Sequence, residues 1–317
     1  LVAARAAQFE FLAIGDVPYG ESDGITPNAV ELGKLDRLAA AANARAFAFT
    51  VHVGDIKRGS NPCTRGYFQI VRNHFGLFQA PFIYTPGDNE WTDCHRAKSG
   101  MQPPAALQAV REVFFPNPRQ SLGKRAMKLQ SQADSPAYAT FIENARWMRE
   151  GVYFATLHVV GSNDNLPDTA PGDPVEQSAR SQAALAWLAE TMTLARQSRA
   201  PGVVFFMQAD PWVMPSVSGA EPAFTPLLLA FEQEVARYDG AVLLVHGDGH
   251  TFCMNHPLRV KGRVAESFTR VQVFGEAAVH GVQVKVDTAT KQVFSPSTFV
   301  VKGNPIAAED SRCPTYR

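Results

Sequence analysis

The sequence of 317 residues has no excess of charge of one sign. It has 30 lysine and arginine residues and 30 aspartate and glutamate residues, so its formal net charge at pH 7 is zero. A nucleic-acid-binding protein normally carries a basic excess or a basic stripe, and the balance argues against that class of partner. No segment reaches the roughly 18 unbroken apolar residues that a membrane-spanning helix needs, so no membrane span is predicted.

Other absences narrow the function further. The sequence lacks a glycine-rich loop that could cradle phosphates, which disfavours a nucleotide-driven kinase or NTPase. It also lacks internal repeats, low-complexity tracts and a convincing linker. Large sheet-based enzymes often have this length as one unit, so we predict a single domain over residues 1–317. Hydrophobic residues at 45% and charged residues at 19% are typical of a globular protein.

The sequence has only four cysteines, without the close Cys-x-x-Cys spacing that zinc sites usually show. Cys63 and Cys94 each follow a Gly-Asp at a predicted strand end, so the fold would bring them together. Cys253 and Cys313 would then pair by elimination, although four cysteines allow three pairings. Two disulfides would favour export to the periplasm or the cell exterior.

The first ten residues, LVAARAAQFE, are small and alanine-rich. They are typical of the remnant of a processed export signal, because an Ala-x-Ala pattern is possible there. A frayed end of a cytosolic protein is the alternative interpretation. With the cysteines, this segment favours an exported protein whose signal peptide has been removed.

Six apolar runs end in acidic residues. The run APFIY is followed by Pro86 and Gly87 and then by Asp88, Asn89 and Glu90, whereas the other five runs end on Asp16, Asp55, Asp164, Asp210 and Asp248. Runs of this length, rich in Val, Ile and Phe, are typical of strands buried on both faces, and ligands of open α/β sheets gather at the carboxyl ends of such strands. Clustered carboxylates repel one another unless cations lie among them, so the pattern predicts divalent cations there.

The order of elements predicts a parallel sheet core with a C-terminal extension. Residues 8–95 alternate strand and helix, which is the βαβ pattern. The predicted elements that follow are an insertion over the active face at 96–140, strands in 144–162, a helix at 176–198, strands at 202–208 and 241–246, and antiparallel strands with a tail at 264–317.

The ordered motifs resemble those of the calcineurin-like metallophosphoesterase superfamily, which includes purple acid phosphatases. They are Gly-Asp at 15–16, Gly-Asp at 54–55, Gly-Asp-Asn-Glu at 87–90 and His-Gly-Asp-Gly-His at 246–250, and the resemblance spans roughly residues 10–275. It implies an α/β (α+β) four-layer αββα sandwich, in which two mixed β-sheets pack face to face between flanking helices. It also implies a two-metal site at one edge.

The resemblance assigns metal ligands position by position. Asp16 is at the first ligand position, and Asp55 at the carboxylate that bridges two metals. Asp88 replaces a liganding Asn, Gln208 or Asp210 replaces a lone His, Asp248 replaces the first His of the last motif, and His250 keeps the second. Pro18 takes the place of another family His. The resemblance implies two divalent metal ions, and because oxygen replaces imidazole, Mn²⁺, Mg²⁺ or Ca²⁺ is expected in at least one site, with iron or Zn²⁺ as the alternatives.

Further residues are assigned to catalysis and substrate binding. Asn89 occupies the position of the family His that assists the leaving group, and His95 is a candidate replacement acid beside the ligand Asp88. The candidate substrate contacts are Tyr19, Lys57, Asn163 and His246. Each has a structural alternative: Tyr19, Lys57 and Asn163 as turn residues, His95 as a solvated loop residue, and His246, like His52, as a supporting histidine. Asp16 and Asp55 could instead cap helices, and His250 could be a core histidine.

These assignments predict an exported hydrolase that uses a metal-activated water on a small phosphorylated substrate, at a dinuclear or degenerate metal site. The alternative is a binding protein that has lost catalysis and holds one metal ion. A single-metal hydrolase of a non-phosphate ester is a third possibility.

Overall fold

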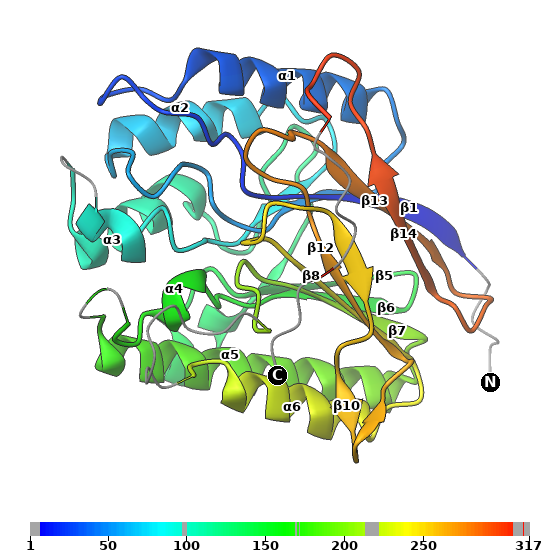
Figure 1. Ribbon diagram of the computed structural model, residues 1–317. Helices are drawn as coiled ribbons and strands as arrows, with labels where there is room; N and C mark the ends of the chain where they lie inside the picture. The colour runs from blue at the N-terminus through cyan, green and yellow to red at the C-terminus, as the bar shows by residue number, and fades with distance from the viewer. Residues whose placement is uncertain are drawn as a thin grey trace.

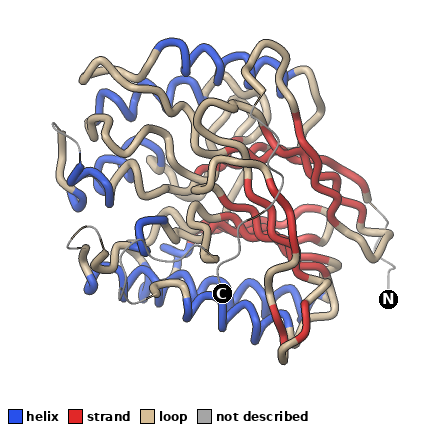
Figure 2. The backbone as a smooth tube through the Cα atoms, viewed as in Figure 1, coloured by secondary structure: helices blue, strands red, loops and turns tan. Residues whose placement is uncertain are grey.

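A computed structural model of the chain describes residues 7–96, 100–168, 170, 172–212, 222–306 and 313. Part of the predicted signal remnant, residues 1–6, lies outside the described residues. Two larger sheets pack face to face, and helices cover their outer faces (Figure 1). In Figure 2 the strands lie toward the right of the view, between helices above and below them. The predicted four-layer sandwich of two mixed sheets is therefore confirmed.

The first sheet has the strand order β14-β13-β1-β2-β3. Its strands are β1 Gln8–Ile14, β2 Thr50–His52, β3 Phe82–Tyr84, β13 Gly281–Asp287 and β14 Phe294–Phe299. β1, β2 and β3 are parallel, with Ile14 opposite His52 and His52 opposite Tyr84. Because these three residues are in register, the segments after them leave the sheet at the same edge.

The second sheet has the order β4-β5-β6-β7-β8-β12-β9. Its strands are β4 Gln130–Ser131, β5 Ala145–Arg149, β6 Val152–Thr156, β7 Gly202–Phe206, β8 Ala241–His246, β9 Cys253–Asn255 and β12 Phe268–Gln272, and a separate pair consists of β10 Arg259–Val260 and β11 Arg263–Val264. β6, β7, β8 and β12 are parallel neighbours. Within the segment 264–317, β12 thus runs parallel to β8, whereas β13 and β14 form an antiparallel pair in the first sheet.

Five helices lie outside the sheets: α1 Ala29–Asn43, α2 Arg65–Phe75, α3 Pro103–Phe114, α5 Pro174–Ser198 and α6 Thr225–Val235. The short segment α4 Gly161–Asp164 is instead a turn beside the strand ends, in which Ser162 and Asn163 have left-handed dihedral angles. The described 3₁₀ helices are η1 Thr92–Arg96, η2 Gln132–Asp134 and η3 Pro136–Tyr138. Pro103 and Pro104 begin α3, because proline fits the first helical turn, where no backbone donor is needed. It stays a prediction that residues 96–140 cover the active face. The assignment of the chain to one domain also stays a prediction. None of the described helices is long and apolar enough to cross a membrane.

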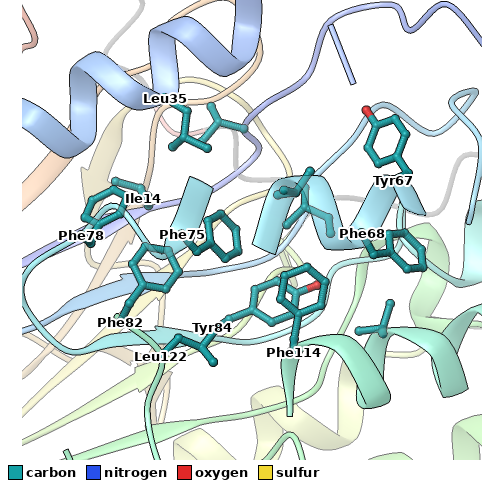
Figure 3. Packing of buried hydrophobic residues seen from close by; sticks show 14 of the residues in the cluster. Ile14, Leu35, Tyr67, Phe68, Phe75, Phe78, Phe82, Tyr84, Phe114 and Leu122 are labelled. Carbon is teal, nitrogen blue, oxygen red and sulfur yellow. The ribbon is translucent and has the colours of Figure 1, made fainter. Parts of the chain in front are cut away.

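Alternating side chains of β1 serve two cores, as a strand buried on both faces requires. Phe11 and Ala13 lie in the core between the sheets, whereas Leu12 and Ile14 pack under the helices. Figure 3 shows this outer core, where the ring of Phe75 on α2 lies 4.5 Å from that of Phe82. Burial of each such side chain contributes about 1.5–3 kcal/mol, so both layers hold the strand ends in place.

Both predicted disulfides are present. Cys63 is bonded to Cys94, and Cys253 to Cys313. The first bond joins the loop after β2 to η1, which follows β3. It therefore connects two segments that leave the same sheet edge.

Candidate metal centre

Asp16, Asp55 and Asp248 each follow a strand and have an unusual backbone conformation. Asp16, Asp55 and Asp248 have φ of 54°, 59° and 73°. Aspartate is one of the few residues other than glycine that visits this left-handed region readily. None of the three caps a helix: the side chain of Asn28 caps α1, and that of Thr64 caps α2. The alternative that Asp16 and Asp55 are helix caps is therefore wrong.

Asp16, Asp55 and His250 form one group of potential ligands. One ligand atom from each side chain lies within 4.8 Å of the others. His250 Nε2 is 3.4 Å from Asp16 Oδ1, and the Tyr19 ring packs edge-on against the His250 ring at 4.7 Å. Two carboxylates, from neighbouring strand ends, thus converge on one point with the imidazole of His250.

Gln208 connects this group to Asp88. Its Nε2 donates to Asp55 Oδ2 and to Asp88 Oδ1, both at 3.2 Å, while its Oε1 accepts from the backbone N–H of Gly161 at 2.5 Å. In this arrangement the amide N–H groups face both carboxylates and the oxygen is engaged elsewhere. The role of Gln208 as a metal ligand stays a prediction.

Asp248 completes the cluster from the second sheet. Its backbone N–H donates to Asp16 Oδ1 at 2.9 Å, and its Oδ2 accepts from the N–H of Asp210 at 3.2 Å. A Cβ atom on Gly161 would lie 2.8 Å from Asp88 Oδ2 and 2.9 Å from Asp248 Oδ1. Only glycine leaves room there, so Gly161 allows both carboxylates to approach the same point.

The electrostatics of the cluster favour a bound cation. Burial and the surrounding carboxylates raise the pKa of Asp16 and of Asp55 well above its usual range. Burial, with a further contribution from Asp88, raises the pKa of Asp248 to about 8. Asp16 Oδ2 is buried and has no hydrogen-bond partner among the described residues. Divalent cations would offset this repulsion, and a donor set of carboxylates with one imidazole fits them.

The loop of Pro86–Trp91 is held by its own acidic residue. Glu90 is fully buried, and its Oε1 accepts from Gly87 N and from the hydroxyl of Tyr84, both at 2.6 Å, and from Asp55 N at 3.2 Å. Asn89 Nδ2 donates to Asp55 Oδ2 at 2.8 Å and to the Tyr19 hydroxyl at 2.5 Å. Glu90 thus fixes the loop, and Asn89 and Tyr19 lie against the predicted bridging ligand.

Two of the six strand-end aspartates form ion pairs instead. Asp164 is 2.5 Å from Arg180 on α5, and Asp210 is 2.9 Å from Arg270 on β12. All four side chains are almost completely buried. Each arginine already balances its aspartate, which makes Asp210 a poor substitute for the missing histidine ligand.

Two predicted substrate contacts are engaged within the protein. Lys57 is buried and its Nζ donates to the Arg58 carbonyl at 2.9 Å, and burial lowers the pKa of Lys57 to about 8. Asn163 is buried on α4, where its Oδ1 accepts from Ala223 N at 3.0 Å. Their contact with substrate stays a prediction.

The histidines fall into different environments. His246 is buried in β8 with Nδ1 2.9 Å from the Gly247 carbonyl, and burial lowers its pKa to about 4. His52 bonds the Val17 carbonyl through Nε2 at 2.8 Å and accepts from Gly54 N at 3.1 Å, which supports its structural interpretation. His95 is exposed on η1, and its Nδ1 lies 2.8 Å from the Thr92 carbonyl. The catalytic role of His95 stays a prediction.

Three residues beside the cluster were not indicated by the sequence. Ser162 Oγ is 2.7 Å from Asp88 Oδ2 and 3.1 Å from Asp93 Oδ1, and Asp93 is paired with Arg96 at 2.5 Å. The only available signal was position: Ser162 follows a buried run in Gly-Ser-Asn-Asp, and Asp93 and Arg96 flank Cys94.

The chain was compared with protein families, curated proteins and solved structures. No family model matches it, and no curated protein does. A dimetal phosphatase from Danio rerio superposes with a TM-score of 0.56 at 12% identity, over 93% of this chain and 99% of the other. A purple acid phosphatase from seeds of yellow lupin (Lupinus luteus) gives a TM-score of 0.51 at 12% identity, over 99% of this chain and 57% of the other.

The similar structures are named as a dimetal phosphatase and a purple acid phosphatase, and at 12% identity they establish the fold. The predicted resemblance is confirmed at that level. This chain has the metallo-dependent phosphatase-like fold shared by dimetal and purple acid phosphatases.

Proposed function

We propose that this protein is an exported, metal-dependent hydrolase of phosphate esters. Asp16, Asp55 and His250 would bind one divalent cation, and Asp55, Asp88 and Asp248 a second. The observation that carries the proposal is the convergence of ligand atoms from Asp16, Asp55 and His250 within 4.8 Å at the strand ends of a phosphatase-like fold.

The residues around the ligands set the character of the reaction. Bound divalent cations supply an acidified water and polarise the phosphoryl group. Asn89 is held by Asp55 and Tyr19, and its amide cannot give a proton to a leaving group as an imidazolium does. His95 keeps Nε2 as the nitrogen that could move a proton, because Thr92 holds its Nδ1. We therefore expect slow turnover that favours esters with good leaving groups.

Export is supported by the cysteines. All four form disulfides, and such bonds persist mainly in oxidising compartments outside the cytosol. The Cys63–Cys94 bond also fastens η1 to the loop that follows Asp55. The Cys63–Cys94 bond thus supports the proposed export, and it also restrains two segments that carry residues of the proposed metal site.

A binding protein with one metal ion is the second candidate. It is favoured by the amide N–H groups of Gln208 and Asn89, which already donate to Asp55. Donors at these two positions partly neutralise the carboxylate without a second cation. Metal content separates the candidates, because two tightly held ions support the enzyme and one ion or none supports the binder.

The test uses protein purified without chelators, with elemental analysis followed by a panel of phosphomonoesters and phosphodiesters. Asp55→Asn should abolish metal binding and turnover, because a neutral amide cannot replace a bridging carboxylate. Asp134→Asn is the matched control, since Asp134 is in a surface ion pair with Arg119. Hydrolysis that is unchanged in Asp55→Asn, or absent from the metal-loaded wild type between about pH 6 and 10, would refute the catalytic proposal.

A further inference from the structure

A guanidinium group lies at the edge of the carboxylate cluster. Arg96 ends η1, and its Nη1 is 2.5 Å from Asp93 Oδ2, while its Nη2 is 3.4 Å from Ser162 Oγ. The Asp93 side chain is 2% exposed, whereas that of Arg96 is 42% exposed. The guanidinium is therefore anchored on a buried acid, while the Arg96 side chain stays partly accessible to solvent.

This guanidinium is close to the residues assigned to catalysis. A Cβ atom on Gly59 would lie 2.8 Å from Asn89 Oδ1 and 3.7 Å from Arg96 Nη1. Arg96 is also linked to the ligand Asp88 through the hydroxyl of Ser162. Arg96 thus lies near Asn89 across Gly59 and is connected to Asp88 through one hydroxyl group.

Two other cationic side chains near the cluster are engaged. Lys57 Nζ is buried against the Arg58 carbonyl, and Arg270 is buried with Asp210. Arg96 has five N–H donors, and among the described residues its contacts with Asp93 and Ser162 use two of them. Its remaining donors form a planar fork that matches the oxygens of a phosphate group.

We infer that Arg96 binds the phosphoryl group of the substrate and makes this site selective for phosphomonoesters over phosphodiesters, an inference that rests on the proposed function. A monoester has three terminal oxygens and carries up to two negative charges, whereas a diester has two terminal oxygens and one charge. An arginine fork beside the metal ligands gains more from the monoester. Asp93 is then a positioning residue, and the Cys63–Cys94 bond beside it restrains η1.

The experiment compares Arg96→Gln with wild type after loading both with Mn²⁺. Calorimetric titration with inorganic phosphate should show affinity about tenfold to a hundredfold weaker in Arg96→Gln, the loss expected for one charge-assisted interaction. Arg96→Lys, which keeps the charge but not the fork, should be intermediate. Arg119→Gln, which removes an exposed arginine of another Arg–Asp pair, should bind phosphate as wild type does. Metal content and circular dichroism of each variant confirm that the centre is intact.

Kinetics supply the second measurement. In Arg96→Gln, kcat/KM for a phosphomonoester should fall by at least about tenfold more than kcat/KM for a phosphodiester. Unchanged phosphate affinity in Arg96→Gln, or a wild type that binds no phosphate, would overturn the inference even if esters are hydrolysed. Conversely, Arg96-dependent phosphate binding without any ester hydrolysis would support the phosphate site and overturn the proposed hydrolase.

Discussion

Replacing Asp248 with Asn should affect stability in opposite directions in the metal-free and metal-loaded protein. The folded pKa of Asp248 is raised from 3.8 to about 8, with burial as the main cause and Asp88 next. The stability contributed by such a group is complete below pH 3.8 and is lost as the pH rises through about 8, because the unfolded state releases the proton first. Metal-free wild type should therefore lose stability relative to Asp248→Asn as the pH rises.

The size of the effect follows from proton linkage. One group that stays protonated in the folded state while ionised in the unfolded state lowers the free energy of unfolding by about 1.4 kcal/mol per pH unit. Between pH 5 and 7 the difference between Asp248→Asn and wild type should thus grow by about 3 kcal/mol. This figure counts Asp248 alone; because Asp248 also raises the pKa of Asp16 and of Asp55, its replacement should lower both and add to the difference in the same direction.

The stability of Asp248→Asn is compared with that of wild type because buried histidines change the free energy of unfolding with pH in the opposite direction. Burial lowers the pKa of His52 and of His246 to about 4, so each adds stability as the pH rises from about 4 to 6.5. These contributions are common to wild type and Asp248→Asn and cancel in the comparison.

The assay is urea denaturation of chelator-treated protein at pH 5, 6 and 7, repeated with saturating Mn²⁺. With metal, wild type should become the more stable protein, because ions that bind only the folded state stabilise it and Asp248→Asn lacks one ligand. Asp134→Asn, in an exposed ion pair, should shift stability by less than about 1 kcal/mol at every pH. A metal-free difference that stays constant from pH 5 to 7 would mean that Asp248 is not buried among the other carboxylates.

Three further predictions concern metals, pH and the disulfides. Mn²⁺, Mg²⁺ or Ca²⁺ should raise the melting temperature of stripped protein, whereas stabilisation by Zn²⁺ alone would show that the ligands are misassigned, with His246 or His95 as the first to re-examine. Hydrolysis should be faster at alkaline pH, because carboxylate ligands would acidify a metal-bound water less than imidazole ligands do, and the reaction should favour good leaving groups, because Asn89 cannot protonate a leaving group; equal rates for p-nitrophenyl and alkyl esters would contradict the second expectation. Removing the Cys63–Cys94 bond by replacing both residues with Ser should cost about 4 kcal/mol in urea denaturation, from a separation of 31 residues, and thiol titration of unfolded, unreduced wild type should find no free thiol.

Much of the site was predictable from local patterns. Buried parallel strands have an apolar signature that can be read from the chain, and in parallel strands the residues that follow must gather at one edge. Asp16 and Asp55 therefore meet as the sequence implied, whereas Asp248 reaches Asp16 from the second sheet, and its approach depends on how the two sheets pack. The pairing of Cys63 with Cys94 follows from the same rule, since each cysteine comes after a strand of that edge.

Other features depended on contacts between distant segments. Six aspartates look alike in sequence, but Arg180 on α5 and Arg270 on β12 reach Asp164 and Asp210 and remove them from the cluster. No sequence pattern near either aspartate predicts the arginine with which it forms an ion pair. That arginine is determined by how a helix or a non-adjacent strand packs against the aspartate. The position of β12 could not be predicted from the sequence for a similar reason, since its alternating residues fit either an antiparallel or a parallel neighbour.

The sequence by itself determined that carboxylates end several buried strands, because apolar periodicity and chain order are local properties. Only the tertiary structure decided which of them lie close together and which are neutralised by arginine. It also decided that Glu90 supports the loop and that Ser162 links Asp88 to Asp93. These choices depend on side chains from different layers meeting within about 3 Å, the range of a hydrogen bond, and that distance is set by packing.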